Sequence, residues 1–191
     1  MNIKLVIIIS FSYSYGFFEI LMSVRQRLKR EKEIVNKGDK ASIWFLMIFI
    51  AIGYFLAFRI GMTTLGRIYH WDLFFASGAI LSVAGLIIRI RSISTLKQHF
   101  TYIVTEIEGH ELIETGLYKF IRHPGYLGQI LIFLGTAISF SNWLSIVLMI
   151  IPVLIGYLYR IRVEEKFMIR QWGQKYLDYQ KKTKRFIPWI Y

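Results

Sequence analysis

The sequence predicts an all-α integral membrane protein with five transmembrane helices, the last two of which form a helical hairpin. Three observations support this fold class. The 191-residue chain is 55% hydrophobic and only 19% charged, whereas a soluble domain is about 45–50% apolar and about 25% charged. Its apolar residues fall into long runs, and its basic residues are concentrated in alternate connections between those runs.

The apolar runs are long enough to be membrane-spanning helices, since a span needs about 20 mostly apolar residues. We expect spans at residues 3–24, 43–60, 72–90, 125–140 and 143–160. The first run lacks a small-residue cleavage site before Arg25, so we interpret it as a retained span. The runs do not alternate with a period of two, so we expect no strands. Gly53 with Ala57 and Gly78 with Ser82 are small-residue pairs suited to helix packing.

The fourth and fifth spans are predicted to form the hairpin. Only Ser141 and Asn142 separate them, which is too short for a loop of any size. Pro152 lies in the middle of the fifth span, where it should kink the helix or free a backbone carbonyl.

Lysine and arginine predict the orientation in the membrane. The segment RQRLKREKEIVNKGDK after the first span carries seven, the segment RIGMTTLGRIYHW between the second and third spans carries two, and the tail from Arg160 carries nine. Cytoplasmic loops carry the excess of these residues. We therefore place the first loop, residues 91–122 and the tail in the cytoplasm and the N-terminus outside, an arrangement that five spans satisfy.

Five spans in 191 residues leave no room for a second domain. We predict a single domain, 1–191, with three N-terminal spans in 1–91 and the hairpin and cytosolic tail in 92–191. The polar segments 92–124 and 161–191 lie on the same side of the membrane and flank the hairpin, so we expect any chemistry where they meet.

Composition also excludes several classes of function. The net charge of +12 flanks apolar spans and forms no soluble module, so we interpret it as facing lipid headgroups and expect no nucleic-acid partner. The chain has no cysteine, which excludes disulfides and thiolate chemistry. Four scattered histidines make a metal site improbable.

Charged residues at the end of the fifth span form the first candidate cluster. Arg160 and Glu164 are four residues apart and share a helix face, with Glu165 rotated beside them, placed to orient the arginine or a backbone amide. A salt-bridged helix end is the purely structural interpretation. Glu19, near the end of the first span, we interpret as an interfacial residue without a functional role.

The stretch RHPGYLG, residues 122–128, is the second cluster. His123 can donate or accept a hydrogen bond near neutral pH, Pro124 stiffens the turn into the fourth span, and Gly125 allows close approach of a ligand to the backbone. The structural interpretation is an interfacial anchor, since arginine, histidine and tyrosine are ordinary at headgroup level.

Together, GLYKFIRHPGYLG and RIRVEEKFMIRQWGQKYLDYQKKTKRFIPWIY resemble the isoprenylcysteine carboxyl methyltransferase family. The family signature is an arginine-histidine-proline turn, a hydrophobic hairpin, a helix with paired glutamates and a GxxYxxY-like tail, here Gly173, Tyr176 and Tyr179. The resemblance is close over residues 95–191, whereas the first half matches only in hydropathy. Phospholipid N-methyltransferases share the paired glutamates and the membrane setting.

The resemblance implies an S-adenosylmethionine-dependent methyltransferase with its cofactor pocket on the cytosolic side. Arg160 matches the residue placed at the acceptor, where a guanidinium fork would hold a carboxylate. The family can use a glutamine before the histidine segment, and here none lies near Ile103, so one cofactor contact is absent or replaced. The positions that match cofactor-binding residues are His110, Glu111, Leu112, Ile113, Tyr118, His123, Pro124, Gly125, Tyr126 and Glu164.

The function implied by the resemblance is methyl transfer to the carboxylate of a prenylated or lipid-like acceptor at the membrane–cytosol interface, with membrane lipids around it. A carboxylate is already a nucleophile and needs no general base, so catalysis would consist mostly of positioning and exclusion of water. Two alternatives stay open: a phospholipid or amine N-methyltransferase on the same scaffold, and a non-enzymatic membrane subunit.

Overall fold

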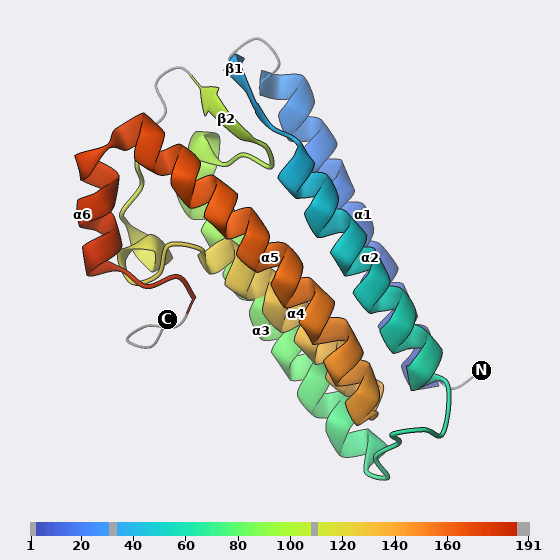
Figure 1. Cartoon of the computed structure of the whole chain (residues 1–191). Helices are drawn as coiled ribbons and strands as arrows, with labels where there is room; N and C mark the ends of the chain where they lie inside the picture. The colour runs from blue at the N-terminus through green and yellow to red at the C-terminus, as the bar shows by residue number, and fades with distance from the viewer. Residues whose placement is uncertain (1–2, 31–33, 108–110, 187–191) are drawn as a thin grey trace.

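The computed structural model describes residues 3–30, 34–107 and 111–186. Its helices form an elongated bundle, shown in Figure 1. The bounds are α1 Ile3–Arg30, α2 Ala41–Gly61, α3 Trp71–Leu96, α4 Pro124–Ser139, α5 Trp143–Trp172 and α6 Gln174–Lys182, with 3₁₀ turns η1 Lys97–His99 and η2 Gly116–Lys119.

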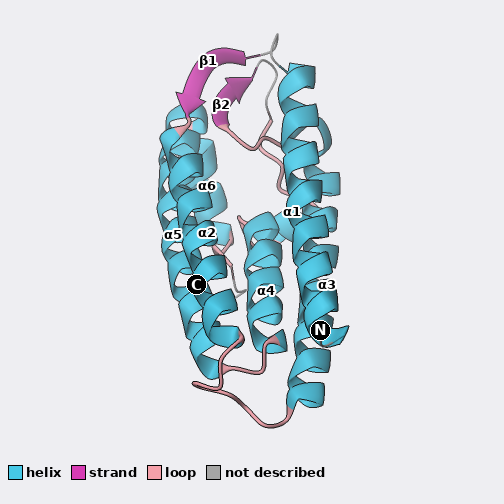
Figure 2. Ribbon diagram, turned by 90° about the vertical axis from the view of Figure 1, so that its right-hand side faces the viewer, coloured by secondary structure: helices cyan, strands magenta, loops and turns pink. Residues whose placement is uncertain are grey.

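Among the residues that the structure describes, four helices, α1, α2, α3 and α5, are long and apolar enough to cross a membrane. The fifth apolar helix, α4, has 16 residues and is therefore about 24 Å long, shorter than the hydrocarbon core of about 30 Å. Figure 2 shows that α4 begins partway along the bundle, while α1 and α5 extend further. The sequence therefore predicted all five apolar elements, and four of them have the length of a span.

The expectation that the chain has no strands is wrong in one place. Residues Ile34–Asp39 (β1) and Val104–Ile107 (β2) form an antiparallel ribbon whose register is irregular, with Asp39 opposite Val104. The ribbon joins the α1–α2 connection to the segment before α4, outside the predicted spans. Two connections that lie side by side can satisfy each other's backbone groups in this way.

Successive helices run in opposite directions, so the connections gather at two ends of the bundle. In Figure 1 the α2–α3 connection, the α4–α5 turn and the start of α1 lie at the lower end, and the ribbon lies at the upper end. At the lower end, Ser141 and Asn142 close the predicted hairpin. The Asn142 side chain accepts a hydrogen bond from Ser145 N at 3.2 Å and caps α5.

Glycines allow α3 and α4 to pack closely. A methyl group added at Gly135 of α4 would lie 2.4 Å from the carbonyl oxygen of Gly78 on α3, and one added at Gly53 of α2 would lie 2.9 Å from the Met149 carbonyl on α5. Gly78 and Gly53 belong to the predicted small-residue pairs, and both lie at helix interfaces. The buried apolar core joins α2, α4 and α5 through Leu46, Ala57, Phe133, Ala137, Met149, Val153 and Tyr157.

The tail after α6 returns to the turn that precedes α4. Arg122 N donates to the Lys184 carbonyl at 2.7 Å, and His123 N donates to the Arg185 carbonyl at 3.2 Å. A parallel bridge pairs Ile121 with Lys184. The two polar segments that flank the hairpin therefore meet, as predicted.

Candidate active site

A cavity of about 590 Å³ lies where these polar segments meet the bundle. Its wall changes character from one side to the other. Side chains from α1, α2 and α4 make an apolar part, which includes Ile20, Val24, Leu46, Met47, Ile50 and Phe133. Side chains from the α4 turn, α5 and α6 make a polar and aromatic part, which includes His123, Tyr126, Arg160, Glu164, Tyr176 and Tyr179.

Arg160 lies on α5 within this wall, and its side chain is only 1% exposed. Its guanidinium donates to the Tyr102 carbonyl at 2.9 Å, to the Tyr126 hydroxyl at 3.4 Å and to the Ser42 hydroxyl. Glu164, one turn further along α5, lies 3.6 Å away, as the shared helix face predicted. The α5 helix continues for about three turns beyond Arg160, so this charge is recessed below the end of the bundle.

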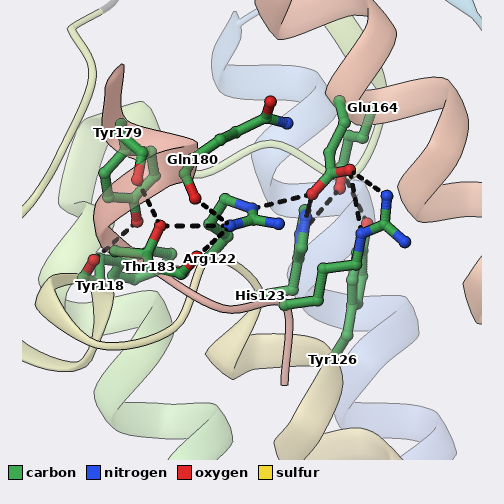
Figure 3. Close-up of polar contacts among 10 residues, drawn as sticks. Tyr118, Arg122, His123, Tyr126, Glu164, Tyr179, Gln180 and Thr183 are labelled. Carbon is green, nitrogen blue, oxygen red and sulfur yellow. Dashed lines mark hydrogen bonds and ion pairs between the residues drawn. The ribbon is translucent and has the colours of Figure 1, made fainter. Parts of the chain in front are cut away.

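Glu164 is the carboxylate that α5 contributes to the cavity wall. It accepts a hydrogen bond from the Tyr126 hydroxyl at 2.8 Å, and its other oxygen lies 3.6 Å from His123 Nδ1. Figure 3 shows His123 and Tyr126 reaching toward Glu164 from below. One carboxylate thus connects the α4 turn to the arginine of α5.

The turn that opens α4 places His123 and Tyr126 together. Pro124 is the first residue of α4, where its missing N–H is not needed and its fixed φ suits a helix start. His123 therefore precedes the helix and Tyr126 lies within its first turn, and their rings stack with centroids 5.7 Å apart. The sequence order H-P-x-Y directs both side chains at the same carboxylate.

Glu165 faces a different set of partners from Glu164. It accepts from Arg122 Nε and Arg185 Nη2, each at 2.9 Å, and lies 3.3 Å from His123 Nε2. The expectation that Glu165 orients Arg160 or a backbone amide is therefore wrong. Successive residues on a helix are rotated by about 100°, so Glu165 faces the α4 turn and the tail.

Arg122 and Tyr179 tie the tail to the site. Arg122 donates to the Gln180 carbonyl at 3.1 Å and to the Thr183 carbonyl. Burial raises the pKa of Tyr179 above its usual value, so its hydroxyl stays protonated and donates to the Tyr118 carbonyl at 2.7 Å. The tyrosines of the GxxYxxY-like tail thus cover the cavity next to η2.

Most of the positions singled out by the family resemblance lie on this cavity. Its wall includes Arg160 and the residues Glu111, Leu112, Ile113, Tyr118, His123, Gly125, Tyr126 and Glu164. Pro124 is buried at the start of α4 and shapes the turn without belonging to the wall. His110 lies outside the described residues. Where the family's glutamine is missing near Ile103, the neighbouring Tyr102 contacts Arg160 through its carbonyl.

The first half of the chain contributes polar groups that sequence reasoning missed. Glu19, which we predicted to be an interfacial residue without a functional role, lies inside the bundle: its side chain is only 15% exposed and binds Arg89 Nη2 of α3 at 2.8 Å. Both residues line the cavity. The sequence did contain an indication of this pair, since a carboxylate and an arginine near the ends of apolar runs need partners inside a bundle. Nothing in the sequence indicated a role for Ser42, at the start of α2.

Within the described residues, no group of three or more histidine, aspartate or glutamate side chains could hold a metal ion.

Comparison with known proteins agrees with this arrangement. A family model described as phospholipid methyltransferase matches residues 73–175, more than half of the chain. The chain belongs to this family of membrane methyltransferases.

Individual relatives point to one branch. A protein-S-isoprenylcysteine O-methyltransferase of Saccharomyces cerevisiae is 36% identical over 115 residues, which cover 59% of this chain and 48% of the relative. Another of Dictyostelium discoideum is 33% identical over 116 residues, covering 60% and 49%. The chain thus spans about half the length of the curated relatives it matches. The resemblance to isoprenylcysteine carboxyl methyltransferases is confirmed.

A solved structure of the eukaryotic intramembrane Ras methyltransferase, an isoprenylcysteine carboxyl methyltransferase, shares the fold. The TM-score is 0.59 at 24% identity, over 80% of this chain and 54% of that one. The helical membrane architecture predicted from the sequence is therefore that of this fold.

Proposed function

We propose that this chain transfers a methyl group from S-adenosylmethionine to the carboxylate of a prenylated or lipid-like acceptor at the membrane–cytosol interface. The observation that carries this proposal is the position of Arg160. Its buried guanidinium lines the cavity and contacts the Tyr126 hydroxyl on one side and, on the other, Ser42 of α2, one turn before the apolar lining residue Leu46. A lipophilic carboxylate fits this arrangement, because its apolar part can contact the apolar side chains and its carboxylate can pair with the guanidinium.

The polar part of the cavity fits the proposed cofactor. The hydroxyls of Tyr157 and Tyr176 are buried in the wall and have no hydrogen-bond partner within the described ranges, which suits a ligand with polar atoms. When bound, S-adenosylmethionine would supply a methyl group activated on a positively charged sulfonium. Glu164 would pair with a positive part of the cofactor, and His123 would hydrogen-bond it.

The other residues assigned by resemblance would complete the cofactor site. Glu111, Leu112 and Ile113 would line it, with Tyr118, Gly125 and Tyr126 on the facing side, and Pro124 would hold the turn. His110 is part of the same proposal.

Arg160 would orient the acceptor. An acceptor carboxylate is already the nucleophile, so no side chain has to remove a proton. The guanidinium fork matches a carboxylate, and the contact with the Tyr126 hydroxyl, at 3.4 Å, is the longest of its hydrogen bonds and the easiest to exchange. The surrounding aromatic and apolar wall would exclude water and strengthen that charge pairing.

We propose five spans, with the N-terminus outside and the site and C-terminus cytosolic. Among the described residues, the connecting segments 34–40, 97–107 and 111–123 and the tail up to Phe186 lie away from the α2–α3 connection. The first loop and the tail carry most of the lysine and arginine. Since basic connections face the cytosol, the cavity would open to a cytosolic cofactor and to an acceptor from the bilayer.

A second candidate is N-methylation of a phospholipid amine, which the description of the matching family favours. The buried positive charge of Arg160 argues against it, because a guanidinium repels a cationic headgroup and suits an anion. The choice between the two depends on the acceptor.

Calorimetry of S-adenosylmethionine binding in detergent tests the cofactor half of the proposal. We expect binding by the wild type, loss of binding in Glu164→Ala and His123→Ala, and no change in Asp178→Ala, whose partly exposed carboxylate lies on α6. A folded wild type that does not bind the cofactor would contradict the proposal.

Transfer of a radiolabelled methyl group tests the acceptor half. We expect label on N-acetylated farnesylcysteine and none on phosphatidylethanolamine. The reverse result would select the amine N-methyltransferase instead, and label on neither would remove both candidates.

A further inference from the structure

The carbonyl that holds Arg160 belongs to a residue fixed from two other directions. Tyr102 accepts from Arg160 through its carbonyl at 2.9 Å, its backbone N donates to Gln26 Oε1 at 2.8 Å, and its hydroxyl donates to Glu19 at 2.8 Å. Gln26 also donates to the Phe100 carbonyl. Both Glu19 and Gln26 lie on α1, so this helix determines where the 100–102 segment lies against α5.

Glu19 is itself held in place by a saturated set of donors. Arg89 of α3 donates to it through Nε at 2.9 Å and Nη2 at 2.8 Å, and Tyr15 donates from one turn earlier on α1 at 2.8 Å. Together with the Tyr102 hydroxyl, each carboxylate oxygen receives two hydrogen bonds. The Arg89 guanidinium also lies 5.7 Å from the centre of the Tyr102 ring.

Burying such a network has a free-energy cost, because its charged groups lose their contacts with water. Only well-placed hydrogen bonds and ion pairs offset this cost, and charged side chains in membrane segments are usually functional for that reason. The network lies on the cavity wall, and α1 lies outside the matched family region, residues 73–175. Neither the family match nor the proposed reaction gives Glu19 a role.

We propose that Glu19 and Tyr102 are positioning residues for Arg160, and that α1 thereby belongs to the acceptor half of the active site. This inference rests on the proposed role of Arg160 at the acceptor. Glu19 fixes the ring of Tyr102, the fixed residue presents its carbonyl to Nη2, and that bond selects one orientation of the guanidinium fork. Preorganised donors need no rearrangement when the acceptor binds.

The Tyr102→Phe variant tests the link, because it removes only the hydroxyl that reaches Glu19 and keeps the ring and the carbonyl. We expect the KM and the equilibrium dissociation constant for N-acetylated farnesylcysteine to rise about tenfold, the worth of one hydrogen bond to a charged group. The dissociation constant for S-adenosylmethionine should not change, because the cofactor residues are not held by Tyr102.

Tyr15→Phe is the matched control. It removes a hydroxyl bond of the same 2.8 Å length from the same carboxylate, but Tyr15 does not contact Arg160. If the network is merely structural, both variants shift Tm and acceptor affinity equally, and the inference fails while methyl transfer by the wild type still supports the proposed function. If the wild type neither binds nor methylates the acceptor, the proposed function fails and the inference fails with it. A selective loss of acceptor affinity in Tyr102→Phe supports both.

Discussion

At the scale of single residues, two adjacent glutamates on α5 have separate tasks. Within the described part of the chain, Glu164 has polar contacts with Tyr126, His123 and Arg160, which all line the cavity. Glu165 is the common partner of two arginines that hold the tail and the α4 turn. We therefore expect Glu164 to serve ligand binding and Glu165 to serve the stability of the fold.

Exchanging each glutamate for glutamine should therefore give opposite results. Glu165→Gln removes a carboxylate that is 6% exposed and pairs with both Arg122 and Arg185, and we expect the free energy of unfolding to fall by about 3–5 kcal/mol. Glu164→Gln should weaken cofactor binding about tenfold or more and reduce stability by about 1 kcal/mol. Thermal unfolding in detergent and calorimetry measure the two effects, and equal decreases in Tm would contradict this division of tasks.

The candidate site also shows how far residue-level reasoning from the sequence reaches. Residue spacing singled out the α4 turn and the Arg160–Glu164 pair as clusters, because i,i+4 spacing and a proline at a helix start have fixed geometric consequences. Their assignment to a cofactor and acceptor site came from the family resemblance. The partners of Glu19 and Glu165 were not predictable. Each ion pair joins segments far apart in the chain, and no periodicity relates residue 19 to residue 89 or residue 165 to residue 185.

At the scale of elements, α3 and α4 can pack closely because glycines without side chains lie at their interface. Gly78 and Gly135 face each other, and Ser82 lies beside them. Without a hydrophobic driving force in lipid, helices associate through close packing of small residues. The short α4 helix is held against α3 by this contact, so the interface fixes the depth at which His123 and Tyr126 enter the cavity.

A single added methyl group at this interface should be destabilising. In Gly135→Ala the new carbon would lie 2.4 Å from the Gly78 carbonyl oxygen, so backbones have to separate, and we expect a loss of about 1–3 kcal/mol. Gly16→Ala makes the same change on α1, where nothing lies within 4 Å, and its Tm should stay the same or rise. If the two variants have equal Tm values in detergent, close packing of α3 on α4 does not stabilise the bundle.

Element prediction from the sequence succeeded where a run of residues determines its own structure. Long apolar runs form helices in any fold that hides their backbone groups from lipid, so all five were found. The β1–β2 ribbon was missed because it depends on two distant connections lying side by side. The bounds of α4, Pro124–Ser139, agree with the predicted span 125–140, because this helix also follows its own apolar run.

At the scale of the whole molecule, the proposed function requires a particular orientation in the membrane. The cofactor is polar and the acceptor lipophilic, so the cavity has to face the compartment that holds the cofactor while remaining in reach of the bilayer. The connections near the cavity and the tail carry most of the basic residues, whereas the α2–α3 connection carries few. Basic segments prefer the cytoplasmic leaflet, so the proposed orientation places the cavity on the cytosolic side.

Single-cysteine labelling can decide this orientation, because the chain has no cysteine of its own. Tyr69, in the α2–α3 connection, is 93% exposed, and the Lys181 side chain on α6 is 72% exposed. We expect a membrane-impermeant maleimide to label Tyr69→Cys in intact cells and Lys181→Cys only after permeabilisation. The wild type should stay unlabelled in both conditions. Labelling of Lys181→Cys in intact cells would place the cavity end outside the cytosol, away from the cofactor, and would contradict the proposed reaction even if the isolated protein bound S-adenosylmethionine.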